Sequence, residues 1–198
     1  MKQIFPIVFG LVVLISCNNG SSTGTANAAS EDFSGYELST IPGSTAKRAI
    51  KKDTNGKILE QGVIENGQRN GQWITFNTEN NLPKTITNFK DGKYTGLLIE
   101  YNNRGQIEKI TSDLDNVLDG HYGQYKFGRT IEEGTYVNGQ LEGVYRTYFN
   151  NKDVIQQEMH YKNGKLDGNA KWFNEEGAVV MEYEYKNGEK VSGGVVGE

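Results

Sequence analysis

The segment Tyr161-Lys162-Asn163-Gly164-Lys165-Leu166-Asp167-Gly168 decides the fold, because its core returns along the chain at a nearly constant interval. Each copy has Asn-Gly, Asp-Gly or Asp-Asn, then three residues, then Gly. The copies span residues 66–71, 91–96, 115–120, 138–143, 163–168 and 187–193, the last with one extra residue. Their closing glycines lie 25, 24, 23, 25 and 25 residues apart. Such a period indicates a repeat architecture, in which each unit packs its apolar face on its neighbours.

Composition narrows the class of protein. The 198 residues include 25 glycines but only 3 prolines, so we expect the glycines to form turns between strands and not to belong to a disordered segment. The 11 tyrosines, 8 phenylalanines and 2 tryptophans also argue against disorder, which is poor in aromatic residues. The net charge is −4, and Lys and Arg are interspersed with Asp and Glu. Because phosphate binding needs a concentrated basic face, the charge pattern argues against a nucleic-acid partner.

Each unit carries two short runs of residues separated by turn residues. Alternation of apolar and polar side chains with period two is the signal of a strand, and it is clearest over residues 179–185. Asn-Gly or Asp-Gly between two such runs is the strongest short signal for a hairpin. No stretch after the N-terminal signal sustains the spacing of an amphipathic helix. The pattern therefore predicts an all-β protein, an antiparallel β-meander of roughly a dozen strands with local connections.

Aromatic residues recur at fixed offsets from the closing glycines. Offset two holds Trp73, Leu98, Tyr122, Tyr145 and Ala170, and offset five holds Phe76, Tyr101, Tyr125, Tyr148 and Phe173. These offsets differ by an odd number, so strand pleating sends the two sets to opposite faces unless a bulge intervenes. At least one face should then carry an aromatic stripe with no second sheet over it. We group nine residues as one candidate binding face: Trp73, Phe76, Tyr101, Tyr122, Tyr125, Tyr145, Tyr148, Trp172 and Phe173. The alternative, that these rings only pack along a thin sheet, stays open.

The consensus of these units resembles the MORN repeat, in the bacterial variant found in YwqK-type proteins. The matching segments are Gly71–Phe76 (GQWITF), Gly143–Tyr148 (GVYRTY) and Tyr161–Gly168, and the resemblance covers about residues 55–193. It implies an elongated, single-layer antiparallel β-meander of about six hairpin repeats of 23–25 residues. The third unit departs most, because Asn116 replaces the turn glycine there. Asn tolerates a left-handed backbone, so we expect that turn to survive.

The same resemblance carries implications for function. Members of this family serve mainly as protein-interaction scaffolds or membrane-associated modules, and the YwqK-type group is labelled as an antitoxin component of toxin–antitoxin systems. We therefore expect a non-catalytic module that binds an unknown protein partner, with antitoxin or immunity function as one version. An exported, lipidated copy would suit immunity against a toxin that arrives from outside.

The N-terminal residues predict export and lipidation. The apolar run of residues 4–15 follows a positive start, is too short to span a bilayer, and is typical of a secretory signal. It ends in Leu14-Ile15-Ser16-Cys17, which resembles the lipobox of bacterial lipoproteins. In that family the cysteine sulfur receives a diacylglycerol, and the signal is cut before the cysteine. Asn and not Asp follows Cys17, so we predict an anchor in the outer membrane that faces the periplasm. The alternative is an ordinary small residue near a conventional cleavage site.

The predicted organisation has four parts. They are a signal peptide (1–16), the lipidated cysteine with a flexible tether (17–45), the repeat domain (46–194) and a C-terminal tail (195–198). Residues 18–44 are mostly Ser, Thr, Ala, Asn and Gly, which cannot bury enough apolar surface to offset the entropy of ordering. A weaker expectation is that the large apolar residues of this segment dock on the first repeat: Phe33, Tyr36, Leu38 and Ile41.

Residues suited to nucleophilic or metal-assisted catalysis are few. His121 and His160 stand 39 residues apart on differently placed strands, so we expect no shared metal site. The serines after residue 44 are Ser112 and Ser192, and neither lies in Gly-x-Ser-x-Gly. With Cys17 committed to lipid, no cysteine nucleophile remains.

Two carboxylate pairs suit the chemistry of a glycosidase, which places two carboxyl groups around a sugar. These pairs are Glu132-Glu133 and Glu175-Glu176, and we place both in or beside turns, where charged groups are solvated. The recurring glycine-containing segment could also be taken for a phosphate-binding loop. The need for positive φ in turns explains its glycines without a bound phosphate. We therefore expect no catalytic residue, no metal and no cofactor. Two alternatives to the binding module stay open: a structural envelope module that self-associates edge to edge, and a weak glycan hydrolase.

Overall fold

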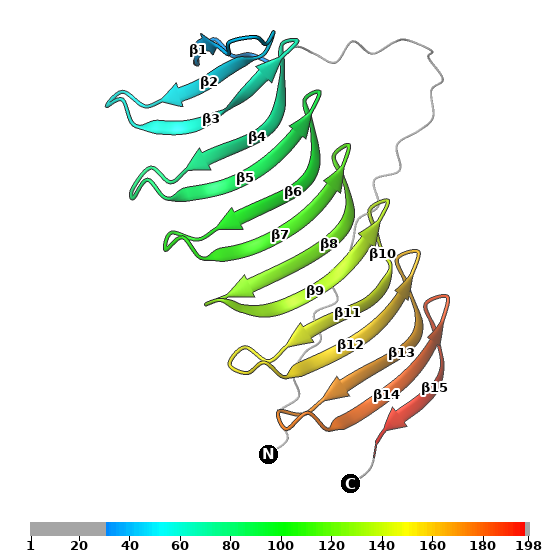
Figure 1. Cartoon of the computed structure of the whole chain (residues 1–198). Coiled ribbons are helices and arrows are strands. Elements are labelled where there is room, and N and C mark those ends of the chain that lie inside the picture. Colours follow the sequence, from blue (N-terminus) through cyan, green and yellow to red (C-terminus); the bar gives the residue numbers. More distant parts are fainter. Residues whose placement is uncertain (1–30, 197–198) are drawn as a thin grey trace, which may run out of the picture.

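The computed structural model of the chain describes residues 31–196, and these form one open antiparallel sheet of fifteen strands (Figure 1). The strands are β1 (Glu37–Thr40), β2 (Lys47–Lys52), β3 (Ile58–Glu65), β4 (Gln68–Phe76), β5 (Pro83–Lys90), β6 (Lys93–Tyr101), β7 (Ile107–Leu114), β8 (Val117–Lys126), β9 (Arg129–Val137), β10 (Gln140–Leu141), β11 (Gly143–Tyr148), β12 (Ile155–Lys162), β13 (Lys165–Phe173), β14 (Val179–Lys186) and β15 (Glu189–Val195). None of the described residues is helical, so the predicted all-β class is confirmed. The predicted signal peptide and Cys17 lie outside the described residues.

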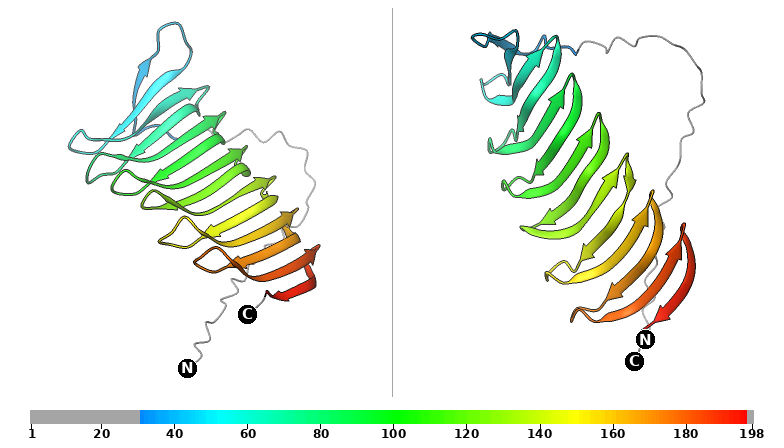
Figure 2. Two further views of the ribbon diagram at one scale, coloured as in Figure 1. Left: turned by 60° about the horizontal axis from the view of Figure 1, so that its bottom comes forward. Right: turned by 45° about the vertical axis from the view of Figure 1, so that its right-hand side comes forward.

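The strands stack in chain order into an elongated row with a single layer, as Figure 1 shows. Each strand is hydrogen-bonded to its neighbours along the chain, and only the short β10 lies off this path, where it pairs with β9. Figure 2 shows that the strands bend, so the sheet forms a curved trough. No helix in the described part of the chain is long and apolar enough to cross a membrane.

Each recurring phrase forms a two-residue turn at one edge of the sheet. Both turn residues have positive φ, as at Asn163 (φ 49°) and Gly164 (φ 74°). This is the geometry of the type I′ turn, whose twist matches that of the flanking strands. Asp115 and Asn116 adopt the same geometry, with φ of 53° and 70°. The replacement of Gly by Asn116 is therefore tolerated as expected.

Neighbouring turns are bonded to each other, which explains the acidic residue before several closing glycines. The N–H of Gly164 donates to the Leu141 carbonyl of the preceding unit at 2.9 Å. Counting this one, five successive turns make the equivalent bond, at 2.7–3.1 Å. In three units a carboxylate also accepts the N–H of the next turn's first residue. These bonds run from Asn138 to Asp119, from Asn163 to Glu142 and from Asn187 to Asp167, at 3.0, 2.7 and 3.0 Å. The recurring segment thus forms the turn and also hydrogen-bonds each repeat to the next.

The number of hairpins differs from the expected six, because fifteen strands exceed the twelve that six hairpins supply. Two of the three extra strands, β1 and β2, come before the first recurring turn, and β1 arises from residues assigned to the tether. The third is β10, which is split from β11 at Glu142. The backbone N–H of Glu142 bonds to the Thr135 carbonyl at 2.9 Å while its carboxylate reaches Asn163. The strand is therefore interrupted where the side chain serves the next turn.

The expectation of a flexible tether up to residue 45 is wrong for its last part. Within residues 31–45, β1 pairs with β2, and Phe33 and Tyr36 pack on a buried cluster of the first units. That cluster is Ala49, Ile64, Trp73 and Phe89. We call residues 31–36 the N-terminal clip. Leu38 remains exposed. At the other end, β15 extends to Val195, one residue beyond the predicted repeat domain.

Candidate functional site

The nine predicted binding residues lie on two faces of the sheet. Cross-strand partners share a face, and the register joins one row that contains Trp73, Thr87, Leu98, Thr111 and Tyr122. We call this side the tryptophan face. It holds four of the nine: Trp73, Tyr122, Tyr145 and Trp172. Alternation along their own strands places the other five on the reverse face: Phe76, Tyr101, Tyr125, Tyr148 and Phe173. The register to the next strand shifts at each of these five residues. The opposite orientation of the two offsets is confirmed, and the grouping of all nine as one face is wrong.

Aromatic rings of the tryptophan face pair edge to face along the array. The centroid distances are 6.3 Å for Trp73–Phe89, 5.6 Å for Tyr122–Tyr136, 6.2 Å for Tyr145–Tyr161 and 5.7 Å for Trp172–Tyr183. Such pairs add about 0.5–1.5 kcal/mol beyond the burial of their area. Trp73 is buried, whereas the later rings are only half-buried. The face therefore remains open to a partner from β8 onward.

A carboxylate lies among the tyrosines in the middle of this face. Glu132, on β9, accepts hydrogen bonds from Tyr122 at 2.5 Å, from Gln124 at 2.6 Å and from the Tyr145 hydroxyl. Three donors converge on one half-buried side chain, and each carries a hydrogen toward the negative charge. This arrangement holds the rings in place and leaves the carboxylate with few free acceptor sites.

Burial and this carboxylate both raise the pKa of the neighbouring tyrosines. Partial burial is the larger cause and the hydrogen bond to Glu132 the second, and together they raise the pKa of Tyr122 to about 12. The pKa of Tyr145 is raised in the same way, and that of Tyr136 is raised by burial and by the charge of Glu132. Ionising any of these rings would place a second negative charge beside the first.

Raising the pH is expected to lower the free energy of unfolding most steeply between pH 10 and pH 12. Tyr122 ionises near 12 in the folded chain against 10 in the unfolded chain, so its contribution is complete below pH 10 and is lost as the pH rises through 12. Tyr36 and Tyr148, whose folded pKa values are also about 12, act with the same sign. Chemical denaturation across this range, followed alongside tyrosinate absorbance, measures the effect. In Glu132→Gln the titration of Tyr122 should move toward 10, and an unchanged titration would contradict this account.

The reverse face carries a different pattern. The row Ile74, Ile86, Ile99 and Ile110 runs across β4 to β7, and the same row continues as Glu133, Arg146, Glu158, Lys171 and Glu182. Successive charges of the second part alternate in sign. Arg146 pairs with Glu158 at 2.8 Å and Lys171 with Glu182 at 3.4 Å. Such half-exposed pairs contribute little individually, so the part of this face from β9 to β14 has the character of a solvated surface.

The carboxylates considered for catalysis do not converge. Glu132 and Glu133 lie within β9 and not in or beside a turn, and their side chains point to opposite faces. The turn comes earlier, at Phe127-Gly128. Glu133 accepts a bond from Tyr148 at 2.6 Å. Glu175 and Glu176 do lie in a turn, as expected.

The two histidines are also separate. His121 lies on β8 and approaches the Tyr125 hydroxyl at 3.4 Å, whereas His160 lies on β12 and donates to the Asn169 carbonyl at 2.9 Å. Two further strands of the sheet path lie between them. Within residues 31–196 no group of His, Cys, Asp and Glu has the arrangement of a metal site.

A shallow hollow of about 440 Å³ lies beside the longer loops. It is lined by Lys84, Glu100, Tyr101, Arg104, Glu108 and Phe127, among others. Phe127 is 66% exposed and has a φ of 54°, a conformation that is uncommon for an aromatic residue. The hollow mixes cations and carboxylates at the rim of the sheet, and no buried carboxylate pair faces into it.

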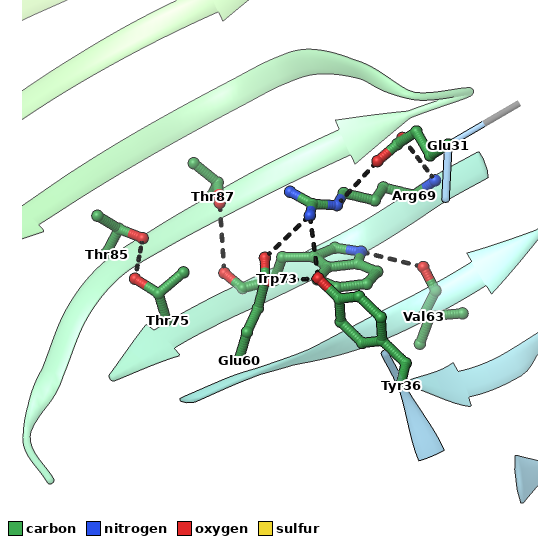
Figure 3. A network of polar contacts seen from close by, with 9 residues as sticks. All are labelled: Glu31, Tyr36, Glu60, Val63, Arg69, Trp73, Thr75, Thr85 and Thr87. Carbon is green, nitrogen blue, oxygen red and sulfur yellow. Dashed lines mark hydrogen bonds and ion pairs between the residues drawn. The ribbon is translucent and has the colours of Figure 1, made fainter. Parts of the chain in front are cut away.

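The N-terminal clip covers the first rings of the tryptophan face (Figure 3). Arg69 lies over Trp73, with its guanidinium carbon 4.6 Å from the ring centroid. It forms ion pairs with Glu31 at 3.0 Å and with Glu60 at 3.2 Å, and it donates to the Tyr36 hydroxyl at 3.3 Å. The cation is thus stacked on one side and neutralised on the other.

Sequence reasoning missed Arg69, although a signal was present. Arg69 stands two residues after the turn glycine, and the same position in the last unit holds Lys190. Lys190 lies over Tyr183, 4.4 Å from its centroid.

No family model matches the chain, and no curated protein matches it either.

Proposed function

We propose that the protein is a lipid-anchored, non-catalytic repeat module of the cell envelope that binds another protein through its tryptophan face. The observation that carries this proposal is the row of half-buried aromatic rings from β8 to β14, on a sheet without a second layer within residues 31–196. Tyr and Trp are the residue types enriched at binding hot spots, and contiguous apolar surface marks interaction sites. Curvature of the sheet adds a shaped surface for the partner (Figure 2).

The stacked type I′ turns and their constant period support the resemblance to MORN repeats. On that reading antitoxin or immunity function is one version of the proposal, since both require binding of a second protein. The non-catalytic part of the proposal is supported by the placement of Glu132 and Glu133 on opposite faces. A glycosidase needs two carboxyl groups on either side of one sugar, within one site.

Site-specific photo-cross-linking in the native envelope tests the choice of face. Tyr94 and Leu97 lie on the same strand with similar exposed fractions, 39% and 47%, but on the tryptophan and reverse faces respectively. Tyr183, half-buried, and Glu184, exposed, are a second pair of neighbours on opposite faces of β14. A photo-reactive residue at Tyr94 or Tyr183 should yield a protein adduct, and one at Leu97 or Glu184 should not. Adducts chiefly from the reverse face, or none at all, would overturn the proposal.

The lipid anchor has its own test. Cys17→Ala should lose the mass of the acyl groups and leave its signal unprocessed, since the cysteine is both the lipid acceptor and the cleavage marker in lipoproteins. Mass spectrometry measures both, and membrane fractionation locates the variant. A variant that stays membrane-bound and is processed as before would refute lipidation, without bearing on the interaction face.

Edge-to-edge self-association is the second candidate, favoured by one observation. Within residues 31–196 no strand pairs with the outer side of β15, the last strand of the sheet, and Val195 is 76% exposed there. Unpaired strand edges template the addition of another strand. A concentration-dependent increase in mass by light scattering that is abolished by a proline at Val195 would favour this candidate over the tryptophan face.

A further inference from the structure

The two ends of the array differ from its middle at one position of the repeat. The residue two places after the turn is apolar or aromatic in the four inner units and cationic in the first and last: Arg69, Tyr94, Leu118, Leu141, Leu166 and Lys190. Both cations lie on the tryptophan face and stack on an aromatic ring. A stacked cation on an open ring face is a recognition element for an anionic group.

At the N-terminal end of the array, the anionic group that pairs with the stacked cation comes from the chain itself. Glu31 of the N-terminal clip pairs with Arg69 at 3.0 Å, and its other oxygen accepts the Arg69 backbone N–H at 3.3 Å. Phe33 and Tyr36 then pack on Trp73, at centroid distances of 6.2 and 6.0 Å. The clip is therefore an acidic residue followed by two aromatic residues, laid over a stacked cation and a tryptophan (Figure 3).

The last units hold the same kinds of group, but on three strands, β13 to β15, whereas Arg69 and Trp73 share β4. Trp172 and Tyr183 form an edge-to-face pair at 5.7 Å and 79°, close to the 6.3 Å and 73° of Trp73 and Phe89. Lys190 lies 4.4 Å from the Tyr183 centroid, as Arg69 lies 4.6 Å from that of Trp73. Among residues 31–196, however, no carboxylate forms an ion pair with Lys190, and no clip covers these rings. We call Trp172, Tyr183 and Lys190 the C-terminal cluster.

We infer that the C-terminal cluster binds an acidic–aromatic peptide segment of a partner protein, in the manner in which the N-terminal clip binds Trp73 and Arg69. The carboxylate of the segment pairs with Lys190, and its aromatic side chains pack on Trp172 and Tyr183. In the middle of the face Lys109 also lies over a ring, 5.9 Å from the centroid of Tyr122. There, however, the Glu132 carboxylate is bonded to the hydroxyl of the same ring, and its negative charge disfavours an acidic segment. This inference rests on the proposed function and names the chemistry of the partner.

A synthetic peptide with the sequence of the clip, Glu-Asp-Phe-Ser-Gly-Tyr, serves as the probe. We expect it to bind the full chain, with a dissociation constant that rises at least about tenfold in Lys190→Glu and as the salt concentration increases. The reversed-charge peptide Lys-Lys-Phe-Ser-Gly-Tyr should bind Lys190→Glu better than the unaltered chain. Lys165→Glu is the matched control, since Lys165 is exposed at the neighbouring turn on the reverse face. Calorimetry with fluorescence of Trp172 measures binding.

Equal binding of the peptide to the unaltered chain and to Lys190→Glu would overturn the inference. A dimer of the full chain that Phe33→Ala dissolves would also overturn it, because the occupant would then be the clip of a second copy. Cross-linking from Tyr94 and Tyr183 separates the two proposals. Adducts that persist in Lys190→Glu, together with a peptide that does not bind, would refute this inference alone. Absence of adducts in both chains would refute the proposed function as well.

Discussion

Trp73→Ala is expected to lower the free energy of unfolding by about 3–5 kcal/mol, the range for removing a large buried aromatic side chain. Trp73 is 1% exposed and touches residues from both the clip and β5. Its Nε1 also donates to the Val63 carbonyl at 3.0 Å, so the substitution leaves that acceptor without its donor. Denaturant unfolding followed by circular dichroism measures the loss.

Trp172→Ala provides the comparison for this prediction. Trp172 lies on the same face of the sheet but is only half-buried, with no clip over it among the described residues. Its removal should therefore cost clearly less than removal of Trp73. Equal losses in the two variants would show that the clip adds nothing to the packing of the first ring.

Gly62→Ala is expected to destabilise the chain by about 3 kcal/mol through overpacking. A Cβ at Gly62 would lie 2.1, 2.3 and 2.5 Å from three atoms of the Trp73 ring, which real side chains do not approach. The ring cannot move aside, because Phe33, Tyr36 and Phe89 surround it. The backbone of Gly62 is not left-handed, so the cost is steric and not conformational.

A double-mutant cycle isolates that steric cost. In the Trp73→Ala background the ring is gone, so adding Gly62→Ala should cost less than about 1 kcal/mol. Gly194→Ala is the control, because a Cβ there meets nothing within 4 Å and the φ is not positive. If Gly62→Ala were equally harmful with and without the Trp73 ring, the clash would not be its cause.

Local signals made most of the fold predictable. Asn-Gly and Asp-Gly place both turn residues at positive φ, and Asn163-Gly164 does so with the expected type I′ geometry. Once the turns are placed, strand pleating determines which residues share a face. The separation of Trp73 from Phe76 followed from their odd spacing alone.

Features that depend on contacts distant in sequence were missed or misplaced. The strand β1 and the clip are ordered because Phe33 and Tyr36 reach Trp73, and composition cannot show such a contact. Glu132 and Glu133 were misplaced, since the turn comes earlier, at Phe127-Gly128. Arg69 and Lys190 occupy equivalent positions that the period could have exposed. That both cations stack on aromatic rings, Arg69 on Trp73 and Lys190 on Tyr183, is visible only in the structure.

The exclusive pairing of strands with their chain neighbours gives the molecule a direction of opening. An array of this kind behaves like a zipper, whose units separate one after another from an end. One end is fastened, because the clip and its ion pairs hold β3 to β5 together. Among residues 31–196 no such clip covers the other end, where β15 is bonded to β14 and its turn to Leu166 and Asp167 of the preceding turn. Amide exchange and fraying should therefore advance from the C-terminal hairpin inward. A partner bound there would stabilise this hairpin and slow both.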